Sequence, residues 1–420
     1  MGIIVQKYGG TSVADPEKIK RVAQSVIREK KNGNNVIVVV SAMGHTTDYL
    51  VKLANEISPS PSHREMDMLL ATGEQVSIAL LTMAIQEAGH DAVSMNAMQV
   101  GIITEKVHSK ARILDVKTEK LMKHINDGKI IVVAGFQGVT PEGEITTLGR
   151  GGSDTSAVAI AGALKADRCD IYTDVEGVYT TDPRVVPKAS RLEQVSYDEM
   201  LELAYLGANV LHPRAVETAK QFDVPLRVRS TFKLDNMGTL ILGVKNMEIY
   251  KPVTGVAADL SQTRIVVCDV PDKPGVSAKI FGALAAKNIS VDMIIQSYAR
   301  QAKATNDVAF TVSTDDVEKT LELLKPIAQE LNASNVHVNN DIAKVSIVGA
   351  GMVDRPGIAA DMFKSLADAG INIRMISTSE IKISCLVDKD KANEAVRRLH
   401  EVFDLGCDEV AEVKGDLPNL

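Results

Sequence analysis

The sequence predicts an α/β protein in which a mostly parallel sheet, covered by helices on both faces, is followed by two small ferredoxin-like βαββαβ units. Two patterns carry this prediction. From residue 3 to about residue 230, short apolar runs such as VIVVV alternate with helical segments, which indicates a buried parallel sheet. Beyond that stretch, a long segment of the chain occurs twice. The core is expected to be aliphatic, because the 420 residues contain no Trp and only 4% aromatic residues.

The first helix has clear end signals. Asp15 can cap its N-terminus, and Pro16 suits the first helical position. Gly33 and the two asparagines after it are expected to end the helix. A strand, a glycine-rich turn and a helix therefore follow one another at the start of the chain.

The duplicated segment reads DKPGVSAKIFGALAAKNISVDMIIQS at residues 272–297 and DRPGIAADMFKSLADAGINIRMISTS at residues 354–379, with a constant offset of 82. Each copy predicts a strand, a Pro-Gly turn, a helix and a strand, after which a further strand and helix follow. We expect the strands after the helices at residues 288–292 and 370–373, where the two units can pair edge to edge. A change of pattern puts a domain boundary at about residues 244–250.

The composition excludes several other classes of protein. A net charge of −7 without any basic tract argues against nucleic-acid binding, because phosphate backbones require clustered Lys and Arg. The four cysteines stand far apart without a CxxC pair, which argues against a disulfide framework or a zinc site. The N-terminus lacks the features of a signal peptide, and no stretch approaches the length of a membrane span. We therefore expect a cytoplasmic protein with no membrane or nucleic-acid partner and no metal site of its own.

Residues 7–12, KYGGTS, lie directly after the first strand, at the edge where open α/β sheets bind ligands. Two glycines let the backbone approach a polyphosphate, and Lys7 adds a compact positive charge. A plain strand-to-helix turn beside a surface lysine is an equally acceptable interpretation of this motif alone. No GxxxxGK[ST] loop is present and no GxGxxG follows a strand, which argues against P-loop and Rossmann sites.

A second glycine-rich element, LGRGGSDTS at residues 148–156, leads into an apolar helix. Ser153 or Asp154 is expected to cap this helix, whose start offers free amides and a positive dipole end to an anion. Arg150 adds a bidentate fork suited to a carboxylate. The alternative interpretation is a glycine hinge with an ordinary N-cap. It is the weaker of the two, because an Arg, three glycines, a Ser and an Asp occur together at one helix start.

Two further elements carry polar side chains. The segment YTDVEGVYTTDPR, at residues 172–184, follows a strand and could hold a base and ribose or form a plain surface turn. Glu74 interrupts an apolar helical stretch, where a lone acid is usually solvated or salt-bridged.

Together these motifs resemble the aspartokinase branch of the amino-acid kinase family, and the resemblance covers nearly the whole chain. The family's motifs occur here in the family's order: KYGGTS, then SAMG at residues 41–44, ATGE at 71–74, GRGGSD at 149–154 and YTDVEGVYTTDPR at 172–184. The duplicated segment is similar to the tandem ACT domains of the same enzymes. The resemblance implies an amino-acid kinase domain at residues 1–245, one ACT domain at 263–340, a discontinuous second ACT domain at 246–262 plus 341–410, and a tail at 411–420.

The implied activity is transfer of phosphate from ATP, with Mg²⁺, to the β-carboxylate of L-aspartate, the first step towards lysine, threonine and methionine. The resemblance implies that Lys7, Asp154 and Arg150 are catalytic. It implies that aspartate is held by Ser153, Gly151, Gly152, Thr47 and Glu74. It implies that the nucleotide is held by Lys7, Tyr8, Gly9, Gly10, Ser41, Thr173, Asp174, Tyr179, Asp182 and Arg184. No general base is expected, because the β-carboxylate is already ionised at neutral pH.

The resemblance also implies feedback control by an amino acid, lysine or threonine or both, that binds between the two ACT units. The residues expected at that site are Asp272, Lys273, Pro274, Gly275, Asp292, Asp354, Asn372 and Ile373. A homo-oligomer joined through the ACT domains is implied as well, together with a short subunit that starts at Met247. The chain departs from the family at Asn209, where many members have a nucleotide-contacting Lys.

Two alternatives are weighed against this interpretation. Kinases of the same fold that act on glutamate, acetylglutamate, carbamate or UMP are disfavoured by Arg150 with its GGSD and by the paired repeats. A catalytically silent amino-acid-binding regulator is disfavoured because Lys7 and Asp154 are both present.

Overall fold

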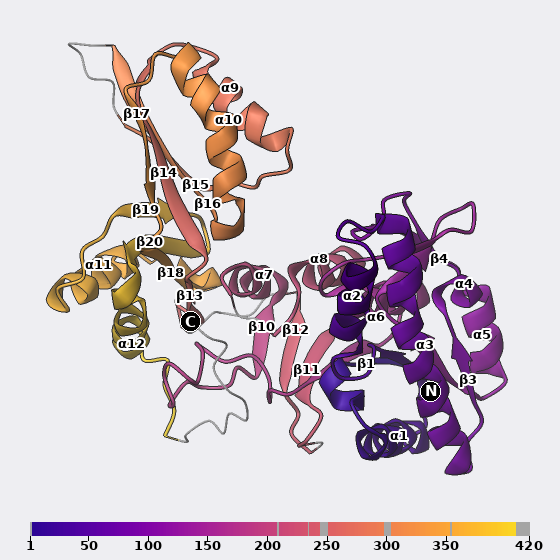
Figure 1. Cartoon of the computed structure of the whole chain (residues 1–420). Coiled ribbons are helices and arrows are strands. Elements are labelled where there is room, and N and C mark those ends of the chain that lie inside the picture. Colours follow the sequence, from indigo (N-terminus) through magenta and orange to yellow (C-terminus); the bar gives the residue numbers. More distant parts are fainter. Residues whose placement is uncertain are drawn as a thin grey trace. The chain divides into compact units, whose positions relative to one another are not determined.

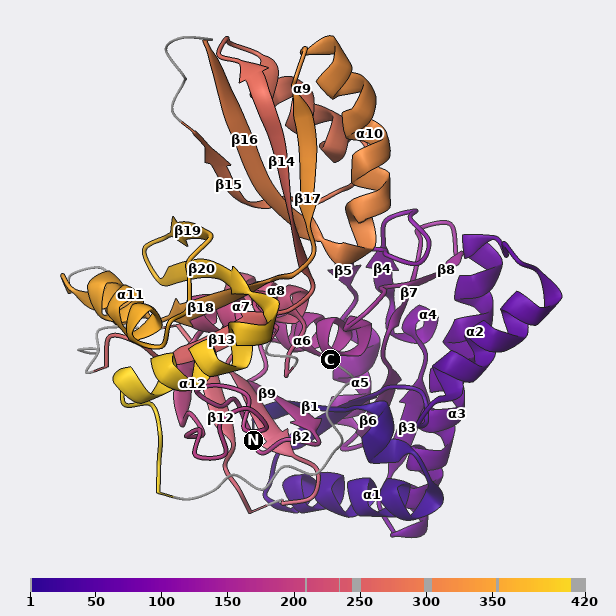
Figure 2. The same cartoon turned by 60° about the vertical axis from the view of Figure 1, so that its left-hand side comes forward.

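A computed structural model describes residues 2–207, 210–233, 235–243, 251–297, 304–352 and 355–408. Their placement divides the chain into two compact units (Figures 1 and 2). The first unit contains residues up to 179 together with 191–243, and the second contains residues 180–190 together with those from 251 onwards. The predicted Asn209, Met247 and Asp354 positions and the tail after residue 410 lie outside the described residues.

The first unit is built on an eight-stranded sheet of order β10-β12-β11-β9-β1-β2-β6-β3. Neighbouring strands are parallel except for the antiparallel pair β11 and β12, which confirms the prediction of a mostly parallel sheet. The central strands are apolar and buried on both faces, as a parallel sheet requires. The strands are β1 (Ile3–Tyr8), β2 (Asn35–Val40), β3 (Ala92–Met95), β6 (Ile130–Ala134), β9 (Arg168–Thr173), β10 (Gln194–Ser196), β11 (Leu226–Ser230) and β12 (Thr239–Leu242).

Helices cover both faces of this sheet. In Figure 1, α1 (Pro16–Lys31) lies on one side of the sheet, and α7 (Tyr197–Tyr205) and α8 (Pro213–Phe222) lie on the other. Alternate residues of the strands pack under α1 and α3 (His63–Glu87), among them Tyr8, Val38 and Val132. The intervening residues face α6 (Gly152–Leu164), which crosses β1, β2 and β9. The remaining helices are α2 (Thr46–Ile57), α4 (Ala97–Val100) and α5 (Glu119–Asn126).

The start of α1 follows the sequence prediction. The Asp15 carboxylate accepts a hydrogen bond from the Lys18 amide at 2.9 Å, and Pro16 is the first helical residue. Gly33, with φ of +88°, ends the turn after the helix. A small side sheet of order β5-β4-β7-β8 completes the unit. Its strands are β4 (Ile102–Thr104), β5 (Ile113–Val116), β7 (Gln137–Val139) and β8 (Ile145–Thr147).

The expectation that no stretch approaches the length of a membrane span is wrong, because among the described helices α3 is long and apolar enough to cross a membrane by length and composition. In this fold it packs against α1, α2, β3, β6 and β8. It also buries two carboxyl groups, those of Asp67 and Glu74. Both features are those of a core helix that carries polar groups inward.

The second unit contains the two copies of the duplicated segment, each on a four-stranded antiparallel sheet. The first sheet, of order β15-β16-β14-β17, is covered on one face by α9 (Val276–Ala285) and α10 (Val317–Glu330) (Figure 2). The second, of order β13-β18-β20-β19, carries α11 (Ile358–Asp368) and α12 (Ala392–Val402). The strands are β13 (Gly255–Asp259), β14 (Gln262–Pro271), β15 (Asp292–Gln296), β16 (Thr305–Ser313), β17 (Asn335–Asn339), β18 (Ile342–Val348), β19 (Met375–Thr378) and β20 (Lys382–Asp388).

The strands that follow α9 and α11 begin later than predicted. We expected them at residues 288–292 and 370–373, but β15 starts at Asp292 and β19 at Met375. The earlier residues form the turn after each helix, where Asn288 and Gly370 adopt left-handed conformations with φ of +57° and +68°. The apolar residues after these turns are buried, so their periodicity resembled that of a strand.

β13 precedes the first sheet in the sequence but pairs with β18 of the second, with Gly255 opposite Val348. The backbone next to this strand pair is close-packed at Gly349, where an added Cβ would lie 2.1 Å from the carbonyl oxygen of Pro252. Neither backbone can move without breaking the pairing of β13 and β18.

Replacement of Gly349 by Ala is therefore expected to destabilise the second unit by about 1–3 kcal/mol, because the added methyl group meets backbone atoms. Thermal and urea unfolding of the full chain measure the change. Gly282→Ala in α9 is the matched control, since an added Cβ there meets nothing within 4 Å. The control is expected to be about 0.5–1 kcal/mol more stable than the original protein. Equal effects of the two substitutions would contradict this packing.

Candidate active site

Four parallel strands of the first unit end at the same edge of the sheet. The pairing register places the last residues of β1, β2 and β6 side by side, with Tyr8 opposite Val40 and Val40 opposite Ala134. β9 ends beside them, since Tyr172 pairs with Tyr8. The loops after these strands therefore meet at one place, which is the usual position of a ligand site in an open α/β sheet.

Lys7 and Asp154 meet at this edge. Lys7 lies on the α6 face of β1, and Asp154 lies in the first turn of α6. The Lys7 Nζ is 2.7 Å from the Asp154 Oδ1, and the two side chains are 13% and 12% exposed. An added Cβ on Gly9 would lie 3.5 Å from the same Nζ, so the glycine leaves the ammonium group uncovered. The ion pair thus fixes a positive charge beside the glycine-rich turn.

The loop before α6 is shaped by glycines with left-handed backbones. Gly149 and Gly151 have φ of +77° and +66°. An added Cβ on Gly151 would lie 2.2 Å from atoms of His212, so only glycine fits. Gly151 is the N-cap, and the predicted capping by Ser153 or Asp154 is wrong, because both residues lie inside the first helical turn.

The start of α6 is open to an anion. Among the described residues, no acceptor is seen for the backbone amides of Ser153 and Asp154. These amides and the positive end of the helix dipole favour a negatively charged group. Arg150 is exposed, and no ion pair holds its side chain within the described part of the chain. A carboxylate can therefore meet both the amides and a guanidinium group.

Glu74 supplies a buried carboxyl group near this edge. Its Oε1 accepts a hydrogen bond from the Ala42 amide at 3.1 Å, while its Oε2 is buried without a hydrogen-bond partner. The adjacent Ser41 hydroxyl donates to the Ser153 hydroxyl at 3.0 Å. Burial raises the pKa of the Glu74 carboxyl from 4.5 to about 7. A cation that reaches Oε2 would satisfy the unpaired oxygen. Thr47 is half-buried in the first turn of α2.

Three of the predicted nucleotide residues lie at or after the end of β9 in the first unit. Thr173 and Asp174 lie at the end of β9 and share a hydrogen bond of 3.0 Å. The Thr173 carbonyl accepts from the Thr231 amide at 2.9 Å, and the Thr231 hydroxyl lies 2.7 Å from that of Ser12. Tyr179 is half-buried in the first unit.

Three other predicted nucleotide residues have their side chains engaged elsewhere or belong to the second unit. The Tyr8 side chain turns to the opposite face, where it stacks on Tyr172 with ring centroids 4.5 Å apart, so only its backbone lies at the edge. Asp182 and Arg184 belong to the second unit and form an ion pair of 2.6 Å with each other.

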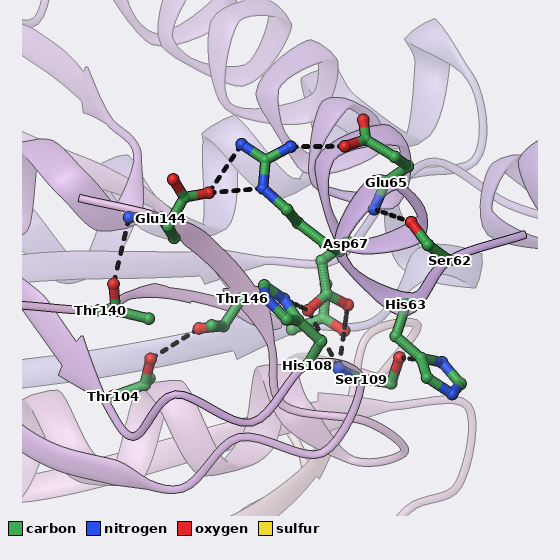
Figure 3. A network of polar contacts seen from close by, with 12 residues as sticks. Ser62, His63, Glu65, Asp67, Thr104, His108, Ser109, Thr140, Glu144 and Thr146 are labelled. Carbon is green, nitrogen blue, oxygen red and sulfur yellow. Dashed lines mark hydrogen bonds and ion pairs between the residues drawn. The ribbon is translucent and has the colours of Figure 1, made fainter. Parts of the chain in front are cut away.

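Sequence reasoning missed the residues that hold the Arg150 loop. Figure 3 shows His108 and Ser109 converging on Asp67, a fully buried residue of α3. The Asp67 carboxylate lies 2.8 Å from the His108 Nδ1 and accepts from the Ser109 amide at 3.0 Å and from the Thr147 hydroxyl at 2.6 Å. A buried acid with this many donors is well satisfied. It ties the segment beside Gly149 to the core.

Arg214 of α8 holds the same loop from the other side. Its Nη1 donates to the Leu148 carbonyl at 2.6 Å, and its Nη2 donates to the Ala111 carbonyl at 2.9 Å. The fork of the guanidinium group thus joins two segments that lie far apart in the sequence. In the sequence, Arg214 is a basic residue directly after Pro213, and sequence reasoning assigned it no role.

Comparisons with known proteins agree with this architecture. The amino acid kinase family model matches residues 2–230, and ACT domain models match residues 263–331 and 345–403. The chain is 55% identical over 405 residues to the aspartokinase of Bacillus sp. strain MGA3, covering 96% of this chain and 98% of that protein. It is 54% identical over 405 residues to aspartokinase 2 of Bacillus subtilis, with the same coverage of both chains.

A solved structure also resembles the whole chain. The crystal structure of E. coli aspartokinase III in complex with aspartate and ADP, in the R-state, matches with a TM-score of 0.80 and 29% identity. The match covers 95% of this chain and 99% of that one. The same E. coli enzyme in complex with lysine and aspartate, in the T-state, matches with a TM-score of 0.74 and 30% identity over 96% of this chain and 99% of that one.

The raised pKa of Glu74 predicts how stability depends on pH. The folded state disfavours the ionised carboxylate, so between about pH 4.5 and 7 it binds more protons than the unfolded chain. Stability therefore falls as the pH rises through this window. Glu74→Gln removes the buried charge and is expected to raise the free energy of unfolding at pH 8 by up to about 3 kcal/mol, with no gain at pH 4.5.

Urea unfolding at the two pH values measures the difference. Glu87→Gln, at the exposed end of the same helix, is the control and should leave both values unchanged. A stabilisation by Glu74→Gln that is equal at both pH values would show that ionisation is not its cause.

Proposed function

Because the chain belongs to the aspartokinases of the amino acid kinase family, we propose that the edge built around Lys7 and Asp154 is where it phosphorylates L-aspartate. The protein is an aspartate kinase that transfers the γ-phosphoryl group of ATP to the β-carboxylate of L-aspartate and yields 4-phospho-L-aspartate. The observation that carries the assignment of the site is the Lys7–Asp154 ion pair of 2.7 Å at the carboxyl edge of the sheet.

Lys7 supplies the positive charge for phosphoryl transfer. Its ammonium group faces the open side of Gly9, so it can neutralise the negative charge on the transferred phosphoryl oxygens. Asp154 holds the ammonium group in place and leaves its other oxygen for the substrate. The β-carboxylate of aspartate is ionised at neutral pH and needs no base, so placement and charge neutralisation account for catalysis.

Aspartate can be held by groups of opposite charge at the two ends of the site. We assign the α-carboxylate to Arg150 and to the free amides at the start of α6, including the backbone of Gly151 and Gly152. The substrate ammonium group would then meet the unpaired Oε2 of Glu74. The hydroxyls of Ser153 and Thr47 are assigned additional hydrogen bonds to the substrate.

The nucleotide is assigned to the turn after β1 and to the ends of β2 and β9. The residues proposed for it are Lys7, the backbone of Tyr8, Gly9, Gly10, Ser41, Thr173, Asp174, Tyr179, Asp182 and Arg184. Mg²⁺ would arrive on the ATP phosphates, whose oxygens are the ligands that this ion prefers. That ion would add positive charge along the β- and γ-phosphates.

The enzyme is allosterically regulated, and we propose that its effector is lysine, threonine or both, bound at the ACT units. E. coli aspartokinase III has been solved with lysine and aspartate in a T-state and with aspartate and ADP in an R-state. In this chain, Asp272 precedes the turn into α9 and accepts from the Asn306 side chain at 3.2 Å, and Gly275 is the N-cap. The other residues proposed for the effector are Lys273, Pro274, Asp292, Asp354, Asn372 and Ile373.

Three broader proposals go with this function. The enzyme opens the route from aspartate to lysine, threonine and methionine in the cytoplasm. It forms a homo-oligomer through its ACT domains. A short regulatory subunit that begins at Met247 accompanies the full chain, which mass spectrometry of the native complex would detect.

Substrate specificity tests the aspartate site. ADP release is expected with L-aspartate and not with L-glutamate or UMP. Arg150→Lys is expected to raise the KM for aspartate at least tenfold and to change the KM for ATP by less than twofold, because a point charge replaces a two-pronged contact. Lys7→Ala is the control for chemistry and should lose nearly all turnover. Unchanged aspartate kinetics in Arg150→Lys, or full turnover in Lys7→Ala, would refute the assignment.

Feedback inhibition tests the regulatory site. Asp272→Ala is expected to raise the half-maximal inhibitory concentration of the effector at least tenfold and to leave the uninhibited kcat nearly intact, since the effector acts by shifting a population. Lysine and threonine are tested singly and together. Asp315→Ala, an exposed acid in the same ACT unit, should leave inhibition unchanged. Loss of catalysis without the effector, or unaltered inhibition, would place the sensor elsewhere.

A further inference from the structure

A polar cavity of about 310 Å³ lies in the first unit, away from the Lys7–Asp154 pair. One wall is the C-terminal half of α1, and the other is formed by β9 and β11. Side chains of the strands alternate between faces, and Tyr172 shares the α1 face with Tyr8. Lys7 faces α6, so the cavity lies on the other face of the sheet. The lining residues are Ser25, Arg28, Glu29, Asn32, Asn34, Arg168, Tyr172, Arg227, Arg229 and Met237.

The lining of this cavity carries more positive than negative charge. Four arginines face one glutamate, the buried Asp170 lies behind them, and Asp235 lies 3.2 Å from the Arg28 Nη1, which leaves a net charge of about +1. Asp170 accepts from the Nε of Arg168 and from the Nε of Arg227, both at 3.0 Å. The one buried acid thus positions two guanidinium groups at the cavity wall.

Both of these guanidinium groups keep donors for a ligand. The Arg168 Nη2 donates to Glu29 at 3.0 Å. Among the described residues, the Nη1 of Arg168 and both Nη atoms of Arg227 have no hydrogen-bond partner. Forked donors at a cavity wall match the oxygens of a carboxylate or a phosphate. A surplus of partly buried positive charge is costly unless an anion compensates it.

The wall on the side of the sheet is cross-linked by side-chain contacts. The Arg229 Nη1 donates to the Tyr172 hydroxyl at 3.1 Å, and its guanidinium carbon lies 5.5 Å from the centre of the Tyr172 ring. Tyr172 stacks on Tyr8, whose hydroxyl lies 3.0 Å from that of Ser25. The guanidinium groups of Arg168 and Arg227, held through Nε by Asp170, are thus positioned beside this wall before a ligand binds.

We propose that this cavity is a second anion site of the enzyme, which binds a small oxyanion carrying two or more negative charges, such as a phosphate or a tricarboxylate. The site is separate from the nucleotide and aspartate site, because it lies on the opposite face of the sheet. Its ligand is recognised by the free Nη groups of Arg168 and Arg227 and by the positive charge of the lining.

Isothermal titration of the full chain with inorganic phosphate and with citrate tests the proposal, and acetate at equal ionic strength is the monovalent control. Phosphate could also bind near Lys7, so each titration is repeated with saturating ADP and with Lys7→Ala. We expect binding of phosphate or citrate to persist in both cases and acetate to show none. Loss of all binding in Lys7→Ala, or with ADP, would overturn the proposal.

Two substitutions in the cavity are expected to weaken binding of the anion. Arg227→Gln removes free donors and should raise the Kd more than tenfold. Asn32→Asp adds a negative charge at the exposed rim without removing a side-chain contact, and should raise the Kd at least threefold. Asn126→Asp makes the same change at the end of α5 and should leave the Kd unchanged. Wild-type affinity in both Arg227→Gln and Asn32→Asp, or an equal loss in Asn126→Asp, would overturn the site.

Discussion

The ion pair between Lys7 and Asp154 is the interaction on which the proposed active site depends. Each charge is mostly buried, and each would be costly to bury without the other. The pair can form only because α6 crosses β1 with its N-terminus at the carboxyl edge of the sheet. The same crossing brings the free amides of α6 to the place where the strand ends meet. One constraint of packing thus places the cation, the anion-binding amides and the glycine turn together.

The site is supported by buried polar contacts that lie outside it. Asp67 anchors the segment of His108 and Ser109, and Arg214 fastens the carbonyls of Leu148 and Ala111. Both anchors act on the loop that carries Arg150, whose own side chain is exposed. A loop held in this way suits the role that we propose for Arg150, because a residue ordered by folding needs little further ordering to meet a substrate in one orientation.

The regulatory unit repeats one small fold and joins the two copies by side chains. Lys344 of β18 forms an ion pair of 2.6 Å with Asp292 of β15, and Met293 packs with Met375 between the two sheets. An effector that binds one arrangement of these sheets better than another would shift the population of states. The second repeat is discontinuous, because β13 precedes the first repeat in the sequence but pairs with β18 of the second. The chain therefore contributes a strand to the second repeat before it forms the first.

The sequence alone determined the elements that depend on local patterns. Alternating apolar runs defined the parallel sheet, Asp15 and Pro16 marked the first helix, and the offset of 82 residues revealed the duplicated fold. The glycine motifs around Lys7 and Asp154 pointed to the two sides of the site because their spacing reflects turns, which are local. Tertiary structure decided what depends on distant partners. The left-handed turns at Asn288 and Gly370 delayed two strands, and packing against His212 made Gly151 the cap of α6.

The same reason explains which side chains were missed. The alternation of a strand sends Tyr8 to the face opposite Lys7, although both belong to one motif. Asp67 and Arg214 act through partners at least 41 and 66 residues away, and no local pattern announces such contacts. The arginine-lined cavity likewise arises only when β9, β11 and α1 lie side by side. Residue types and their spacing can therefore predict the chemistry of a site. Burial and pairing across the fold determine which of its groups remain free to bind a ligand.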